Sequence, residues 1–299
     1  MLNAEDRRNS ENRKNRENGN QPDSKATAAL PEKGGQDLHR QPEEPLIELR
    51  HISKSFRAGT EETHHALKNI NLSIYAGDFI TIVGGNGAGK STLLSIIAGS
   101  LAADSGEVRI QGKNVTDTHE HERAQYISRV FQNPLDGTVP RMTIAENMAL
   151  ALRRGKRRGL AMGSKRTEQG VFRESLAALK LGLEDRLNTE IGLLSGGQRQ
   201  AVSLLMATMK EPLLLLLDEH TAALDPNTQK KIMNLTEEKI KEKSLTAFMI
   251  THNLKDAIQY GNRLLLMHQG EIHSEFALAE KEKLTANQLY QMMNELSAN

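Results

Sequence analysis

The chain has 299 residues, enough for one large domain or two small ones, and we expect one composite domain. Charged residues make up 26% of the chain and nearly cancel, to a formal net charge of +1, so the overall charge gives no indication of a nucleic-acid partner. Cysteine is absent, which excludes disulfides and cysteine-ligated metals, and no apolar run forms a secretory signal or approaches the about 18 residues of a membrane span.

Residues 1–44 are dominated by Asn, Arg, Glu, Gln, Lys and Gly. They offer too little apolar surface to offset the entropy lost on ordering, so the composition predicts a disordered polar tail. Its basic residues could contact anionic lipid, but the interleaved Glu and Asp favour a solvated tail. We expect the folded domain to occupy residues 45–299.

The domain begins with short segments whose alternation or Gly and Asp boundaries predict strands, at residues 46–52, 71–74, 79–83 and 107–112. Between about 133 and 210 the apolar residues recur at helical spacing, which predicts an inserted helical unit. Short apolar runs at 213–217, 247–250 and 263–267 are typical of strands covered on both faces. This order predicts an α/β fold.

The segment GGNGAGKS, residues 84–91, follows a predicted strand and precedes a predicted helix, as a phosphate-binding P-loop does. Backbone N–H groups of such a loop point at phosphate oxygens, and the helix adds its positive dipole end. We expect Lys90 to bridge the β- and γ-phosphates of ATP and Ser91 to supply a hydroxyl to Mg²⁺. The predicted nucleotide-binding residues here are Gly84, Gly85, Asn86, Gly87, Ala88, Gly89, Lys90, Ser91 and Thr92.

Two acids, Asp218 and Glu219, follow a run of five leucines. An apolar strand ending in Asp is the usual supplier of a magnesium-orienting carboxylate in P-loop NTPases, so we assign this role to Asp218. Adjacent side chains of a strand point to opposite faces, so Glu219 shares the site only if the strand ends there and the chain turns. Glu219 is then expected to polarise the attacking water.

The segment SGGQ, residues 195–198, leads directly into an apolar helix. Ser195 and Gln198 have the spacing of a capping box, so these residues could serve only to begin the helix. Two consecutive glycines, Gly196 and Gly197, also permit close approach of the backbone to an anion at the helix N-terminus. The paired glycines favour the second interpretation.

The order of LSGGQ, the phosphate loop and the acidic strand resembles that of the ATPase subunit of an ABC transporter, over residues 46–272. The resemblance implies a P-loop NTPase core of ABC ATPase type with an antiparallel β subdomain and the helical subdomain inserted at about 133–210. It further implies that Phe56 stacks on adenine, that Asp225 lies in a loop at the dimer interface, and that His252 contacts the γ-phosphate. By the same resemblance Gln132 contacts Mg²⁺ and links the nucleotide to the helical unit, and Ser195, Gly196, Gly197 and Gln198 bind the ATP held by a second subunit.

Taken singly, Phe56 could be a core aromatic residue, Gln132 a polar loop residue and His252 a histidine satisfied at a strand end. Most ABC ATPases carry proline where this chain has His220. We favour a structural role for His220 over that of a proton-sensitive neighbour of Glu219. The basic segment 153–159, with Lys165 and Arg166, could be a solvated loop or could contact lipid or a permease.

The resemblance implies an ATPase that closes as a dimer, most simply a homodimer, over two ATP molecules with Mg²⁺. It drives a separate integral membrane permease, and indirectly a solute-binding protein, from the cytoplasmic face of the membrane. The sequence is similar to importer ATPases, some assigned to aromatic amino acids such as tryptophan. An exporter subunit or a soluble ABC ATPase outside transport remains the alternative. No nucleic-acid partner is expected.

Overall fold

The computed structural model describes residues 44–57, 63–155 and 166–298, except for the side chains of Arg166 and Thr167. Almost all of the predicted tail and much of the basic segment therefore lie outside the described residues. Residues 42–299 form one unit, which is described by itself below.

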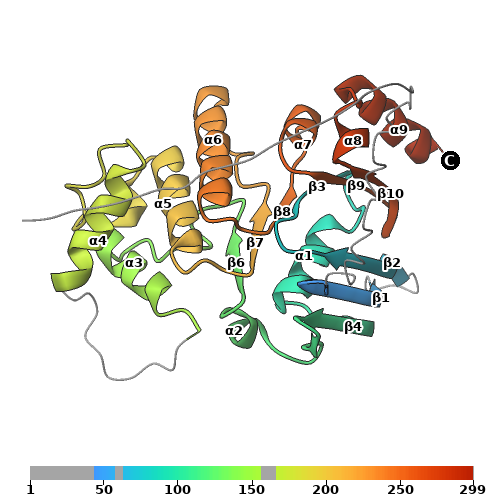
Figure 1. The fold of residues 1–299 in the computed structure, drawn as a ribbon, viewed down its shortest axis with the longest axis horizontal. Coiled ribbons are helices and arrows are strands. Elements are labelled where there is room, and N and C mark those ends of the chain that lie inside the picture. Colours follow the sequence, from blue (N-terminus) through green and yellow to red (C-terminus); the bar gives the residue numbers. More distant parts are fainter. Residues whose placement is uncertain (1–43, 58–62, 156–165, 299) are drawn as a thin grey trace, which may run out of the picture. The chain divides into compact units, whose positions relative to one another are not determined.

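Two sheets make up the β structure (Figure 1). The first is antiparallel, with the strand order β2-β1-β4-β5. Its strands are β1 (Ile47–Arg57), β2 (Thr63–Ile74), β4 (Ser105–Ile110) and β5 (Lys113–Asn114). On β1 the buried residues alternate at its start, because one face of this sheet packs on the core and the other faces solvent.

The second sheet has six strands in the order β10-β9-β3-β8-β7-β6, parallel except for the β9–β10 pair. Its strands are β3 (Phe79–Gly84), β6 (Ile127–Val130), β7 (Leu214–Asp218), β8 (Ala247–Ile250), β9 (Arg263–His268) and β10 (Glu271–Ala277). Every residue of β3 and β8 and the four leucines of β7 are buried, as expected for strands covered on both faces.

Helices follow β3, β6, β7 and β8 of the parallel part of the sheet, and others follow β5 and β10. In chain order they are α1 (Lys90–Ala98), α2 (Glu120–Arg123), α3 (Ile144–Leu152), α4 (Arg166–Ala177), the 3₁₀ turn η1 (Ile191–Leu193), α5 (Gly196–Thr208), α6 (Pro226–Glu242), α7 (Leu254–Gln259), α8 (Leu278–Lys281) and α9 (Ala286–Ala298). Within the described ranges, none of these helices is long and apolar enough to cross a bilayer.

Helices α3, α4 and α5 lie together between β6 and β7 in the chain and are grouped in Figure 1. They share a hydrophobic core that includes Met148, Phe172, Leu176 and Val202, each fully buried. A separate core joins the antiparallel sheet, α1 and the six-stranded sheet. The predicted fold class, with an antiparallel sheet and a helical insertion, is confirmed, whereas the limits 45–299 and about 133–210 stay predictions.

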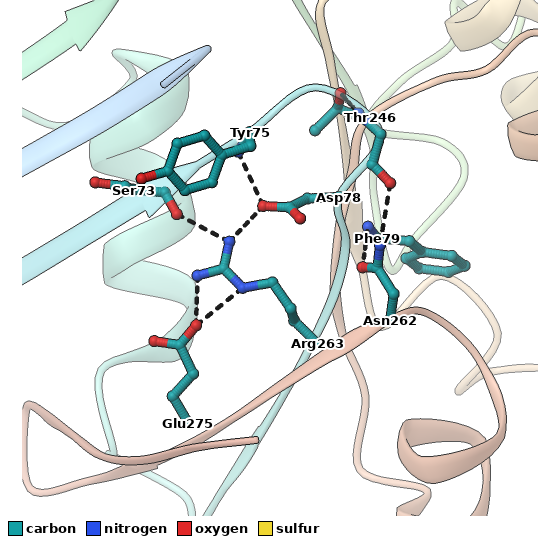
Figure 2. A network of polar contacts seen from close by, with 9 residues as sticks. Ser73, Tyr75, Asp78, Phe79, Thr246, Asn262, Arg263 and Glu275 are labelled. Atoms are coloured by element: carbon teal, nitrogen blue, oxygen red, sulfur yellow. Dashed lines mark hydrogen bonds and ion pairs between the residues drawn. The ribbon is translucent and has the colours of Figure 1, made fainter. Parts of the chain in front are cut away.

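A polar network ties the two sheets together at the start of β3 (Figure 2). Arg263, at the start of β9, forms ion pairs with Asp78 and Glu275 and donates from Nη1 to the Ser73 carbonyl at 2.9 Å. The Asp78 carboxylate also accepts from the Tyr75 N–H at 2.9 Å. Arg263 thus links the end of β2 to β9 and β10 and fixes the turn from which β3 begins.

Candidate nucleotide-binding site

The glycine-rich loop connects β3 to α1, and two of its glycines are fixed by close packing. A Cβ atom at Gly84 would lie 2.3 Å from the Met267 carbonyl oxygen, and one at Gly89 would lie 2.3 Å from the Ala66 carbonyl oxygen. Gly89 also has a φ of 96°, which favours glycine. At Gly85 and Gly87 a Cβ would meet nothing within 4 Å. The loop is therefore tightly held at its ends, while its middle is open.

Lys90 is the first residue of α1 and is almost fully buried. Its Nζ donates to the carbonyl oxygens of Gly84, at 2.8 Å, and Gly85, at 3.0 Å. Burial lowers the pKa of Lys90, and the negative charges of Glu219 and Asp218 oppose that change. The ammonium group is thus placed at the loop with two carboxylates close enough to act on it.

A cavity of about 250 Å³ lies in front of the loop. It is lined by Phe56, His64, Ala66, Asn86, Gly87, Ala88, Gly89, Lys90, Ser91, Thr92, Glu219 and His252. The structure therefore brings the predicted adenine-stacking aromatic, most of the phosphate loop and three of the predicted catalytic residues, Lys90, Glu219 and His252, to one surface.

Strand β7 ends at Asp218, and the chain turns there. Glu219 has a φ of 45°, in the left-handed region that few non-glycine residues adopt, and its N–H donates to the Ile250 carbonyl at 3.1 Å. This turn is the condition under which Asp218 and Glu219 could both face the nucleotide. Glu219 Oε1 lies 2.5 Å from Nε2 of His252, so the ends of β7 and β8 meet at the cavity.

Asp218 is paired with a cation from the neighbouring strand. Its Oδ2 accepts from Nη2 of Arg129, on β6, at 2.6 Å. Both side chains are largely buried, with 15% and 14% of their surfaces exposed. The sequence analysis did not identify Arg129, because a charged residue in a short strand gives no signal of what lies opposite it.

His220 follows Glu219 in the turn, and its side chain is buried against α6. Its Nε2 lies 3.0 Å from Oγ1 of Thr236 on α6, and the Thr236 hydroxyl itself donates to the Ile232 carbonyl at 2.8 Å. The Thr236 oxygen therefore accepts a hydrogen bond from His220, which requires the neutral tautomer protonated at Nε2. Burial lowers the pKa of His220 to about 4.

Other predicted residues lie outside this cavity. Gln132 is exposed on the loop after β6. Asp225 caps α6, accepting from the N–H groups of Asn227 and Thr228 at 3.2 and 3.1 Å, and hydrogen bonds from Thr228 lower its pKa.

The segment from Ser195 to Gln198 begins α5, also outside the cavity. Ser195 Oγ accepts from the Gln198 N–H, and Gln198 Oε1 accepts from the Ser195 N–H, both at 3.3 Å, so the capping box is formed. A Cβ at Gly197 would lie 2.3 Å from Cγ2 of Thr228. Packing against α6 is therefore one reason for a glycine at this position.

His64 and Ala66 are cavity residues that the sequence analysis missed. His64 stands opposite Phe56 in the β1–β2 pairing, and both line the cavity. The register between the two antiparallel strands, which contains irregularities, could not be read from the sequence, so this neighbour of Phe56 was not predictable.

The donors near the loop suit Mg²⁺. Ser91 is exposed beside Lys90 and offers a hydroxyl, and Asp218 offers carboxylate oxygens at the end of β7, which β8 separates from β3 in the sheet. Hard oxygen ligands of this kind, one or two from the protein and the rest from phosphates and water, are the set that Mg²⁺ prefers. The residues present therefore fit the predicted ion.

Together, the fold and the site define a class: an α/β P-loop protein that places a lysine, a glutamate and a histidine around a cavity in front of its glycine-rich loop. A family model described as "ABC transporter" matches residues 67–222. The chain belongs to the ABC transporter family, as an ATP-binding domain. The resemblance seen in its motifs is confirmed.

Relatives of known description agree. The tyrosine transport ATP-binding protein of Clostridioides difficile is 41% identical over 82% of this chain and 97% of its own length. The sulfate/thiosulfate import ATP-binding protein CysA of Halalkalibacterium halodurans is 37% identical over 76% of this chain, which spans only 60% of that relative.

Among solved structures, a dimeric, post-hydrolysis state of the ATP-binding cassette MJ0796 bound to ADP and Pi superposes with a TM-score of 0.66. It is 34% identical and covers 78% of this chain and 98% of its own. A protein of the same name comes from Methanocaldococcus jannaschii. The chain is thus an ABC ATPase, an enzyme whose ATP hydrolysis is coupled to transport.

Proposed function

We propose that this ATPase energises the import of an aromatic amino acid, or a similar small solute, through a separate permease in the membrane. The support for an amino acid is the 41% identity to a protein described as serving tyrosine transport, which extends over 97% of that protein. Because an ATPase subunit does not contact the solute, the substrate follows from this likeness and not from any pocket.

In the proposed reaction, Phe56 stacks on the adenine and the N–H groups of residues 84–92 hold the phosphates. Lys90 neutralises charge on the phosphoryl group that is transferred, where preorganised cations contribute most to the rate. Mg²⁺, held by Ser91, Asp218 and Gln132, would supply further neutralisation of the phosphate charge.

Glu219 is proposed to orient and polarise the attacking water, and His252 to hold Glu219 and contact the γ-phosphate. The observation that carries this assignment is the 2.5 Å contact of His252 Nε2 with Glu219 Oε1 at a cavity that Lys90 also lines. A carboxylate held in one position by this contact is oriented to polarise a water molecule.

The signature residues Ser195, Gly196, Gly197 and Gln198 are proposed to bind the ATP of a second copy, with Asp225 at the same interface. The support is their position at the start of a helix with two exposed residues, and the dimeric state of the related cassette. The dimer would act on the permease at the cytoplasmic face of the membrane through contacts near Gln132, and a solute-binding protein would deliver the solute.

The substrate is tested by uptake in cells that lack this chain. Labelled tyrosine, tryptophan, phenylalanine and sulfate are supplied to cells complemented with the wild-type chain or with Glu219→Gln. We expect aromatic amino-acid uptake to return only with the wild-type chain. Uptake of all three amino acids that is unchanged by loss of the chain would contradict the proposed substrate class.

A further inference from the structure

Arg129 is paired with Asp218, the last residue of β7 and the residue of that strand that we propose orients Mg²⁺. On β6 it stands opposite Leu216 of β7, and its guanidinium reaches two residues along to Asp218, at 2.6 Å. The guanidinium carbon lies 4.7 Å from the centre of the Phe131 ring, which covers one of its faces. The side chain is therefore fixed between an anion and an aromatic ring.

Arg129 gains little else from this position. Its Nε–H is buried and donates no hydrogen bond to any of the described residues. A buried donor left without a partner is costly, so a structural cation alone gives a poor account of an arginine here. The main polar contact that Arg129 makes in this position is the ion pair with Asp218.

We propose that Arg129 competes with Mg²⁺ for the Asp218 carboxylate and thereby raises the concentration of Mg²⁺ that this ATPase needs for nucleotide binding. The inference rests on the proposed role of Asp218 as a magnesium-orienting residue. Arg129 is a positioning residue, since it does not line the cavity in front of the loop and acts through Asp218.

Two effects of Arg129 on the metal oppose each other. By holding Oδ2 it restricts the rotation of the carboxylate, which favours metal binding by the small entropy of one side-chain torsion. By placing a positive charge in contact with Asp218 it cancels much of the charge that attracts a divalent cation. At a partly buried site the Coulomb energy of two charges in contact is several times the entropic free energy gained by fixing one torsion. The net effect of Arg129 is therefore to weaken Mg²⁺ binding.

The consequence concerns the order of binding. A site whose carboxylate is already paired holds free Mg²⁺ weakly, and the phosphates of the nucleotide must add their own charge before the ion is retained. Arg129 would therefore leave Asp218 able to help hold the ion mainly when the phosphates of ATP are also present as ligands.

The test measures binding and not turnover. A fluorescent ATP analogue is titrated onto full-length protein in the Glu219→Gln background at increasing Mg²⁺, with affinity in EDTA as the metal-free baseline. Arg129→Gln keeps a hydrogen-bond donor but removes the charge, Arg129→Met removes both, and Arg129→Lys keeps the charge. Thermal unfolding of each nucleotide-free variant establishes that it is folded.

We expect Arg129→Gln and Arg129→Met to lower the half-saturating Mg²⁺ by about fivefold or more, and Arg129→Lys to stay within about twofold of the parent, because only the first two remove the charge. Asp218→Asn should raise the half-saturating Mg²⁺, and adding Arg129→Gln to it should have no further effect.

If the neutral variants leave the half-saturating Mg²⁺ unchanged or raise it while Asp218→Asn raises it, Arg129 does not compete with the metal and the inference is overturned, with Asp218 still assigned. If Asp218→Asn leaves the magnesium dependence unchanged, the proposed role of Asp218 is itself wrong. The two failures are thereby distinguished.

Discussion

His252 and Glu219 meet at 2.5 Å across the ends of β8 and β7, although they are separated by the whole of α6 in the chain. Glu219 is largely buried, with 12% of its side chain exposed, whereas 47% of the His252 side chain is exposed. The histidine can therefore be removed without opening the core, and this makes the pair suitable for a functional test.

His252→Ala is expected to reduce ATP turnover at least tenfold, because Glu219 loses the group that orients it. Since the side chain is half exposed, the midpoint of thermal unfolding should stay within a few degrees of the wild type. Steady-state phosphate release and a thermal melt measure the two effects. Wild-type turnover in this variant would remove His252 from the site.

Gly197 offers a test that separates packing from ligand binding. A methyl group there would collide with Cγ2 of Thr228, so Gly197→Ala should destabilise the protein by about 1–3 kcal/mol. Thr228→Ser removes Cγ2 and should restore stability in the double variant, as urea unfolding would show.

The ATPase activity of that double variant then decides the role of the glycine. If Gly197 also approaches the ATP of a second subunit, turnover should remain low after stability is restored. Full recovery of turnover would mean that Gly197 is needed only for packing against α6.

His220 should make folding stability depend on pH. Its pKa is lowered to about 4 in the folded protein, against 6.5 in an unfolded chain, so between these values the unfolded chain binds more protons. The stability it contributes is present above pH 6.5 and is lost as the pH falls toward 4, by up to about 3 kcal/mol.

Urea unfolding of the wild type and of His220→Leu from pH 7.5 to 4.5 isolates this contribution, because other groups titrate alike in both. As the pH falls, the unfolding free energy of the wild type should decrease relative to that of His220→Leu. Parallel pH profiles would contradict the assignment of a buried neutral histidine.

We further expect His220→Pro to keep turnover within about an order of magnitude, since the ring contacts Thr236.

The network of Figure 2 should carry more stability than an exposed ion pair. Arg263→Met leaves the Asp78 carboxylate buried without its cation and should cost about 3 kcal/mol. Arg109→Met is the matched control, because Arg109 and Glu107 form an exposed pair on β4 and should contribute less than about 1 kcal/mol. Equal losses in chemical unfolding would show that the network does not join the two sheets energetically.

The sequence predicted those parts of the molecule in which a local pattern determines the structure. Buried runs gave β3, β7, β8 and β9, and the glycine pattern placed Lys90 at the start of α1. The turn at Glu219 was predicted from the requirement that two adjacent acids face one site, and its left-handed φ agrees.

Contacts between distant segments were not predictable in this way. Strand β6 has four residues and β10 is mostly exposed, so neither gave a clear apolar pattern, and both were missed. Arg129 lies on β6, and its approach to Asp218 follows only from the order of strands in the sheet. His64 likewise depends on strand register.

The most direct test of the account is phosphate release by Glu219→Gln, measured together with ATP binding. The account predicts that turnover falls by about two orders of magnitude or more, as expected for loss of the group that polarises water, while ATP is still bound and a dimer accumulates on gel filtration with Mg²⁺ and ATP. Turnover close to that of the wild type would contradict the central claim that Glu219 activates the attacking water at this site.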